Sequence, residues 1–204
     1  MSTSTLTVRV TRKVVEAEGI CSFELVHVDG VPLPAFSAGS HVDVQLPGGP
    51  TRQYSLCNDP AESHRYLIAV LRDAASRGGS AAMHERVAEG DLLTISAPKN
   101  HFALAHEAKR HLLLAGGIGI TPLLCMAEHL TGQGDSFELH HCTRSSERTP
   151  FVVRVSASAY ADRVQHHFDD GDAAQKLDFA ALLQRAPPGT HLYVCGPTGF
   201  MDAV

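Results

Sequence analysis

The chain lacks the features that mark secreted, membrane-bound and nucleic-acid-binding proteins. It has no tryptophan, no apolar run of the roughly 18 residues that a membrane span needs, and no signal peptide at residues 1–5. Its five cysteines are too few and too scattered for a disulfide framework. The net charge of −5 comes from charges of both signs spread along the chain, which argues against nucleic-acid binding. We therefore expect a cytoplasmic protein with no membrane or nucleic-acid partner.

The histidines also lack the spacing of a metal site, although the chain has 13 of them. The doublets His140-His141 and His166-His167 fall in segments that are predicted to be strands. Adjacent strand residues point to opposite faces of a sheet, so neither doublet can bind one ion by itself. We expect no native metal site.

The chain has enough apolar sequence for two small domains. Its 204 residues are 44% hydrophobic, and this length has room for two units of about 100 residues each. The first part of the sequence is a series of alternating segments separated by turns, which is typical of an antiparallel Greek-key β-barrel. The expected strands are Thr5–Val15, Cys21–His27, His41–Leu46, Thr51–Leu56, Arg65–Leu71 and Asp91–Ala97. One helix, Ala81–Ala88, interrupts them, and Ser80 is its expected N-cap.

The second part of the sequence alternates strands with helices, as a doubly wound parallel α/β sheet requires. The expected strands are His111–Ala115, Ser136–Cys142, Arg163–Phe168 and His191–Cys195, and the expected helices are Thr121–Leu130, Pro150–Ser156 and Asp178–Gln184. The linker is placed at Pro98–Lys109. This division gives a barrel domain at residues 1–104 and an α/β domain at residues 105–204.

A glycine-rich turn follows the apolar strand at His111–Ala115. Its sequence is Gly116-Gly117-Ile118-Gly119-Ile120-Thr121-Pro122, and proline suits the first turn of a helix. Glycines between a buried strand and a helix bring backbone N–H groups up to a dinucleotide pyrophosphate. The turn therefore indicates a nucleotide site, and the alternative is an ordinary strand-to-helix turn.

The segment Arg52-Gln53-Tyr54-Ser55 places a phosphate-binding guanidinium two residues from an aromatic plane on one strand face. Downstream, Gly78-Gly79 precede the expected helix, whose N-terminal N–H groups could receive a phosphate together with Arg52, Arg77 and the Ser80 hydroxyl. A flat ligand with a phosphate tail fits this arrangement. The alternatives are a solvated arginine beside a core tyrosine, and an ordinary capped surface helix.

A third motif ends the strand His191–Cys195 in Cys195-Gly196-Pro197. In this order the three motifs resemble those of the ferredoxin–NADP reductase superfamily. Arg52–Asp59, Tyr66–Val70 and Arg77–Ser80 look like its phthalate dioxygenase reductase branch. Thr143–Ser145 and Phe168–Asp172 are similar to the vanillate O-demethylase reductase subunits of that branch. The resemblance runs from about residue 5 to the last residue.

The resemblance implies an NADH-dependent flavin oxidoreductase that serves a multicomponent aromatic-ring oxygenase or O-demethylase. Hydride would pass from NADH to the flavin, and single electrons would pass on towards an iron–sulfur acceptor. Ser55 and Cys195 would be the catalytic residues, although a lone cysteine at a strand end can equally be a small buried apolar residue. The implied cofactor-binding residues are Arg52, Gln53, Tyr54, Ser55, Ala69, Val70, Arg77, Gly78, Gly79, Ser80, Gly116, Gly117, Gly119, Thr121, Pro122, Thr143, Arg144, Cys195, Gly196 and Pro197.

The cofactor choice also follows from the resemblance, which implies FMN in preference to FAD and NADH in preference to NADPH. The segment Thr143–Arg148 is ambiguous, because Glu147 suits NADH whereas Arg144 and Arg148 could accommodate a 2′-phosphate. The implied partner is a Rieske-type oxygenase that a monomeric reductase meets transiently. Nothing in the chain encodes the aromatic substrate.

The family continues past the Cys-Gly-Pro motif with a helix, a last strand and a [2Fe–2S] module, which is ligated by C-x4-C-x2-C and one further cysteine. No such spacing occurs in this chain. Because stopping at Val204 leaves an α/β sheet with an uncovered edge, we expect a truncated chain. Two other functions stay open, namely a stand-alone flavin or ferric reductase and a non-catalytic flavin- or nucleotide-binding regulator.

Overall fold

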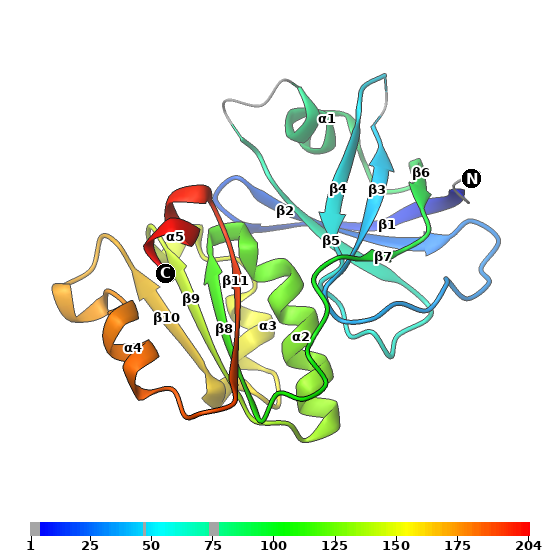
Figure 1. Cartoon of the computed structure of the whole chain (residues 1–204). Coiled ribbons are helices and arrows are strands. Elements are labelled where there is room, and N and C mark those ends of the chain that lie inside the picture. The colour runs from blue at the N-terminus through cyan, green and yellow to red at the C-terminus, as the bar shows by residue number, and fades with distance from the viewer. Residues whose placement is uncertain (1–4, 47, 74–77) are drawn as a thin grey trace.

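The first half of the chain forms an antiparallel barrel. The computed structural model describes residues 5–46, 48–73 and 78–204. Seven strands form one sheet in the order β4-β3-β6-β1-β2-β5, with β7 paired to β3 (Figure 1). Their bounds are β1 Thr5–Ala17, β2 Ile20–His27, β3 Ser40–Gln45, β4 Thr51–Ser55, β5 Tyr66–Leu71, β6 Leu92–Ser96 and β7 Lys99–Asn100. An isolated bridge between Leu56 and Ile68 joins the end of β4 to β5 and closes the sheet on itself.

Alternating side chains fill the barrel. Val8 and Val10 of β1 and Val42 and Val44 of β3 are fully buried, while the residues between them are at least partly exposed. This period of two is the pattern of a strand with one face on a core and one towards solvent. On β4, the register pairs Tyr54 with Val42, so the tyrosine lies on the core side of the strand.

In the described part of the barrel there is one helix, α1 (Gly79–Arg86), which begins two residues before the expected helix. Its N-cap is Gly78, whose φ of 92° lies in the left-handed region that glycine tolerates. The prediction that Ser80 caps this helix is therefore wrong. Ser80 lies in the first turn, and its hydroxyl accepts a hydrogen bond from the backbone N–H of Asp73 at 3.0 Å.

The second half of the chain forms a four-stranded parallel sheet in the order β10-β9-β8-β11. The strands are β8 Arg110–Gly116, β9 Phe137–Thr143, β10 Val164–Phe168 and β11 Thr190–Cys195. The helices are α2 Ile120–Gln133, α3 Val152–Ser156, α4 Phe179–Arg185 and α5 Thr198–Ala203, and the short 3-10 turns are η1 Gly117–Gly119, η2 Ser146–Arg148, η3 Ala161–Arg163 and η4 Ala173–Gln175. The fold class predicted from the sequence is confirmed, with displaced strand ends and an unpredicted short β7.

Helices cover both faces of the parallel sheet. Leu113 and Leu139 belong to the core that α2 and α3 build on one face, whereas Leu112 and Leu114 pack with Leu182 of α4 on the other. The strand order changes direction between β8 and β11. From β8 the chain adds β9 and β10 on one side of that strand, and it then places β11 on the other side. Open α/β sheets bind ligands outside the carboxyl ends of the strands at such a reversal.

The barrel and the parallel sheet stand side by side and share one core (Figure 1). Ala38, Cys57 and Ala69 of the barrel are buried in the same cluster as Leu124 and Cys125 of α2. No helix in the described part of the chain is long and apolar enough to cross a membrane.

Candidate functional site

A cavity of about 440 Å³ lies where the carboxyl ends of β8 and β11 meet strands β4 and β5 of the barrel. Most of the site residues predicted from the sequence line it. They are Arg52, Gln53, Tyr54, Ser55, Ala69, Val70, Ser80, Gly119, Thr121, Cys195 and Gly196. Tyr54 and Cys195, which come from different sheets, therefore open onto the same cleft.

Strand β4 supplies the polar and aromatic groups on the barrel side of the cleft. Arg52 lies against the first turn of α1, because a Cβ built on Gly79 would come within 2.8 Å of Arg52 Nε. Among the described residues Arg52 has no carboxylate partner, and its Nη1 donates only to the Thr51 carbonyl at 3.0 Å. A guanidinium without a counterion beside the N–H groups of a helix start fits an anionic group such as a phosphate. Burial raises the pKa of the Tyr54 phenol, which Arg52 partly offsets, so the ring stays neutral.

Ser55 and Gln53 lie on the other face of β4. Ser55 pairs with His41 of β3, and Gln53 donates its amide to Asp43 Oδ1 at 2.9 Å. Hydrogen bonds from Lys99 and then from Gln53 hold the pKa of Asp43 below its usual value. The hydrogen bond therefore holds the Gln53 side chain on the strand, and Ser55 lines the same cleft.

The glycine turn at the end of β8 forms η1, and its three glycines have different reasons to be glycine. Gly117 has a φ of 53°, which other residues rarely adopt. A Cβ on Gly119 would lie 2.1 Å from the Cys195 carbonyl oxygen, so only glycine allows the turn to cross the end of β11. A Cβ on Gly116 would meet the ring of Phe200 in α5 at 2.7 Å. Gly116 thus makes room for a side chain of this protein, and it does not line the cavity.

Cys195 and Thr121 complete the parallel-sheet side of the cleft. Burial raises the pKa of the Cys195 thiol, so the group stays protonated and neutral near pH 7. The Thr121 hydroxyl donates to the Ile118 carbonyl at 3.1 Å and fixes the start of α2. Pro122 is buried in the first turn of α2, as expected, but Pro122 and Pro197 lie outside the cavity lining.

The segment after β9 was predicted to contact the nucleotide, and it lies outside this cavity. The buried Thr143 hydroxyl bonds to the Thr149 hydroxyl at 2.7 Å and donates to the Ser145 carbonyl, so it fixes the turn itself. Arg144 is exposed. Arg148 forms an ion pair at 2.7 Å with Glu18 at the end of the β1–β2 hairpin.

The remaining predicted residues have other positions. Gly78 caps α1 and Gly79 contacts Arg52, whereas Arg77 lies outside the described residues. The cavity also has three lining residues that the sequence did not predict, namely Leu71, Asp73 and Ile118. Ile118 stands within the glycine motif and could have been inferred from it, but Leu71 and Asp73 carry no signal.

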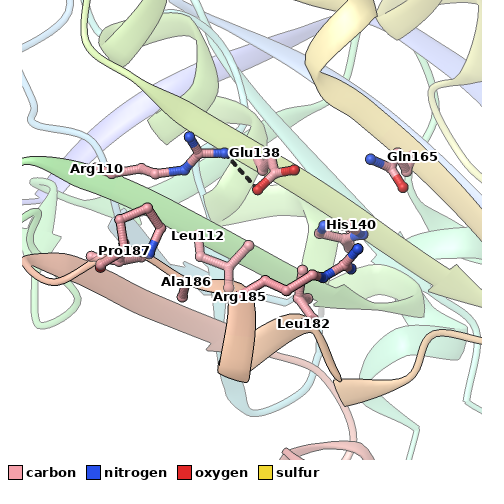
Figure 2. Close-up of a pocket in the computed structure, with 10 residues that line it drawn as sticks. Arg110, Leu112, Glu138, His140, Gln165, Leu182, Arg185, Ala186 and Pro187 are labelled. Atoms are coloured by element: carbon pink, nitrogen blue, oxygen red, sulfur yellow. Dashed lines mark hydrogen bonds and ion pairs between the residues drawn. The ribbon is translucent and has the colours of Figure 1, made fainter. Parts of the chain in front are cut away.

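A second hollow of about 310 Å³ lies at the amino ends of β8 and β9, beneath α4 (Figure 2). Arg110 and Glu138 form an ion pair of 2.7 Å on one side of it, and Arg185 lies beside His140 on the other. Because this hollow is at the opposite end of the sheet from the three motifs, it does not belong to the candidate site.

The histidine doublets alternate across the sheet as predicted. His140 and His167 face each other on the α4 side of the sheet, while His141 and His166 meet on the opposite side. Among the described residues no group of three metal-ligating side chains comes together.

The sequence and the fold are similar to those of oxygenase reductases. The chain is 58% identical over 189 residues to the vanillate O-demethylase oxidoreductase of Pseudomonas putida, covering 93% of this chain and 59% of that protein. It is 42% identical over 200 residues to the phthalate dioxygenase reductase of Burkholderia cepacia, covering 98% of this chain and 62% of that protein. A solved structure of a phthalate dioxygenase reductase superposes with a TM-score of 0.92 at 42% identity, covering 98% of this chain and 62% of the other. No family model matches the sequence.

A barrel and a doubly wound sheet that share a cleft define the ferredoxin–NADP reductase-like class of fold, which binds flavins and pyridine nucleotides. Within that class, this chain has the fold of phthalate dioxygenase reductase and is a close homologue of the vanillate O-demethylase and phthalate dioxygenase reductases. It spans about 60% of the length of the relatives that it matches.

Proposed function

We propose that this chain is the flavin- and nucleotide-binding part of an oxygenase reductase, in which hydride passes from NADH to FMN and single electrons then leave for an iron–sulfur acceptor. The observation that carries the proposal is the cavity between β4 and β11, which brings Tyr54 and Cys195 to one cleft. A bound flavin supplies the conversion of a two-electron transfer into two one-electron transfers. The residues of the chain bind and orient the two ring systems. We take residues 1–104 as the flavin domain and residues 105–204 as the nucleotide domain.

The barrel side of the cleft would hold the flavin. Arg52 and the first turn of α1, with Gly79 and Ser80, would bind the phosphate. Tyr54 offers a neutral ring for the flavin to lie against, and Ser55 offers a hydroxyl at the cleft edge. The described residues on the barrel side form one anion site, which favours FMN, with its one phosphate, over FAD.

The parallel-sheet side would hold the dinucleotide. The N–H groups of η1 and the start of α2 favour an anionic pyrophosphate, and Gly119 allows them to approach Cys195 closely. The Cys195 thiol is neutral and small, so it excludes water beside the nicotinamide without acting as a nucleophile. Two further observations favour NADH over NADPH. Arg148 is already neutralised by Glu18, and Glu147 is exposed, where a ribose hydroxyl can reach its carboxylate.

The partner and the location are part of the same proposal. The relatives are named as reductases of demethylase and dioxygenase systems, which supports an oxygenase component as the partner. We further propose that this partner is of the Rieske type and meets a monomeric, cytoplasmic reductase transiently. The aromatic substrate would bind that partner and never this chain.

Purified protein should be yellow or should become yellow on addition of FMN, and anaerobic NADH should then bleach the absorption near the visible flavin bands. Steady-state NADH oxidation with ferricyanide as the acceptor separates a reductase from a regulator that only binds the cofactors. A folded sample that takes up no flavin refutes the roles of Arg52, Tyr54 and Ser80. Flavin binding without any NADH oxidation would instead support a non-catalytic regulator that only binds the cofactors.

A further inference from the structure

We propose that His141 is a positioning residue of the nucleotide site, which holds the Gly117 carbonyl against the sheet so that the Ile118 N–H is presented to a pyrophosphate oxygen. The proposal rests on the proposed function, because it concerns the same nucleotide. No motif predicted a role for His141, which lies on β9 and outside the glycine turn.

The contact between His141 and the turn is well defined. His141 is completely buried, and its Nε2 lies 3.0 Å from the Gly117 carbonyl oxygen. Since a carbonyl oxygen only accepts, Nε2 must carry the proton and donate. The sheet register pairs His141 with Ala115 and the next residue with Gly116, so the imidazole lies directly beside the end of β8 where the turn begins.

The direction of the Gly117 carbonyl sets the direction of the next N–H. The peptide between Gly117 and Ile118 is planar and trans, so its C=O and its N–H point in opposite directions. With the carbonyl turned towards β9, the Ile118 N–H points away from β9, on the side where Ile118 lines the cleft. This N–H belongs to the first turn of a helical segment, where the backbone donors have no intrahelical partner and suit an anion.

The Gly117 carbonyl also accepts a hydrogen bond from the Ile120 N–H within the turn, so His141 adds a second bond that holds the carbonyl against β9. Gly117 has a φ of 53°, and a Cβ on it would meet no heavy atom within 4 Å, so packing around the glycine does not fix it. Glycine also has the largest range of backbone conformations. Burial lowers the pKa of His141 to about 4 and keeps the ring neutral near pH 7, so it has a single N–H, which the contact with the Gly117 carbonyl places on Nε2. The residue facing it on β10 is His166, with ring centroids 5.6 Å apart, and burial also lowers the pKa of His166.

The test measures binding of ADP-ribose, which carries the pyrophosphate, and of adenosine, which does not, by calorimetry on the flavin-loaded protein. His141→Phe removes the donor and keeps a ring in the space, and it should weaken ADP-ribose about tenfold, as expected for one hydrogen bond to a charged group. Adenosine binding and FMN content should stay unchanged. His141→Gln restores an N–H near the Nε2 position and should recover most of the affinity. The matched control is His166→Phe, on the same face of the neighbouring strand but not bonded to Gly117, which should bind ADP-ribose as the unmodified protein does.

Steady-state kinetics give a second readout, in which His141→Phe should raise KM for NADH with little change in kcat. Equal ADP-ribose affinity in His141→Phe and in the unmodified protein overturns the proposal. If the phenylalanine does not fold, the unmodified protein still decides, because the amide ¹H–¹⁵N signal of Ile118 should move on addition of ADP-ribose and much less with adenosine. An Ile118 signal that ignores both ligands overturns it too. Failure of the proposed function looks different, because the unmodified protein would then bind neither flavin nor ADP-ribose.

Discussion

Gly119 and Cys195 lie so close together that no side chain fits between them, since a Cβ on Gly119 would come within 2.1 Å of the Cys195 carbonyl oxygen. The contact is between backbone atoms, so no side-chain rotation can relieve it. It joins the start of the first helix of the parallel sheet to the end of β11, and both residues line the cleft.

Gly119→Ala should therefore displace the turn from Cys195 and impair NADH oxidation. A misplacement of about 1 Å at a reacting site costs roughly 100-fold in rate, so we expect a loss of kcat/KM for NADH of about that size. Flavin content should stay normal, because Gly119 is on the parallel-sheet side of the cleft and not on the barrel side. The matched control is Gly132→Ala in α2, where a Cβ meets no heavy atom within 4 Å and the better helix propensity should slightly stabilise the protein. Equal kcat/KM for NADH in the two variants would show that the turn can move away from Cys195 without loss of activity.

Arg52→Ala should weaken FMN and spare riboflavin. The lost contacts are charge-assisted hydrogen bonds to a phosphate, worth roughly 10- to 100-fold in affinity, and riboflavin has no phosphate to lose. Fluorescence titration of the apoprotein with both flavins measures the difference. Arg86→Ala removes an exposed arginine from the other end of α1 and should change neither affinity. If riboflavin binding falls as much as FMN binding, Arg52 supports the fold of the pocket and not the phosphate.

Glu18→Gln should improve the use of NADPH. Glu18 neutralises Arg148 through an ion pair of 2.7 Å, in which both side chains are largely exposed. An exposed pair is worth up to about 1 kcal/mol, so we expect the ratio of kcat/KM for NADPH to that for NADH to rise about two- to fivefold at low salt. The double variant with Arg148→Ala should return to the original ratio. An unchanged ratio in Glu18→Gln means that Arg148 does not reach the 2′-phosphate.

The buried His140, which lies beside His167 on the other face of the sheet, should make the protein sensitive to mild acid. Burial and then His167 lower the pKa of His140 to about 4, while an unfolded chain has a histidine pKa of about 6.5. The unfolded state therefore takes up a proton first as the pH falls. The free energy of unfolding therefore keeps its full value above pH 6.5. It falls between pH 6.5 and about pH 4, by about 1.4 kcal/mol per pH unit for each such histidine.

Urea unfolding at pH 7.5, 6 and 5 measures this slope. His140 Nδ1 lies 3.0 Å from His167 Nε2, and His140→Asn keeps a donor there without a titrating ring. The variant should lose stability less steeply than the unmodified protein between pH 6 and 5. His106→Asn, at an exposed position, serves as the control and should leave the slope unchanged. Parallel curves for all three proteins would contradict the assignment.

The sequence was sufficient for the fold because its local patterns agree with the tertiary structure. The alternation in β1 and β3 reflects one buried face, whereas the continuous apolar run of β8 reflects two. Hydrophobic periodicity therefore predicted all three strands. Short or strained elements were harder. β7 has two residues and no period to detect, and the start of α1 depends on the left-handed conformation of Gly78, which outweighs the capping preference of Ser80.

The site could be predicted only as far as motifs extend. The spacing of Gly116, Gly117 and Gly119 marks the turn, but it does not reveal that the first accommodates Phe200 and the last accommodates Cys195. Those reasons depend on residues about 80 positions further along the chain, which a local pattern does not contain. The Glu18–Arg148 ion pair could not be predicted for the same reason, because the sequence around each residue does not indicate a contact with the other.

The common core of Ala38, Cys57 and Ala69 with α2 ties the two sheets into one cooperative body. Heating should melt barrel and parallel sheet in a single transition, and a calorimeter should record one peak where two loosely tethered lobes would give two. Because this seam is packed with buried side chains, we expect the barrel and the parallel sheet to keep one relative orientation when a ligand binds.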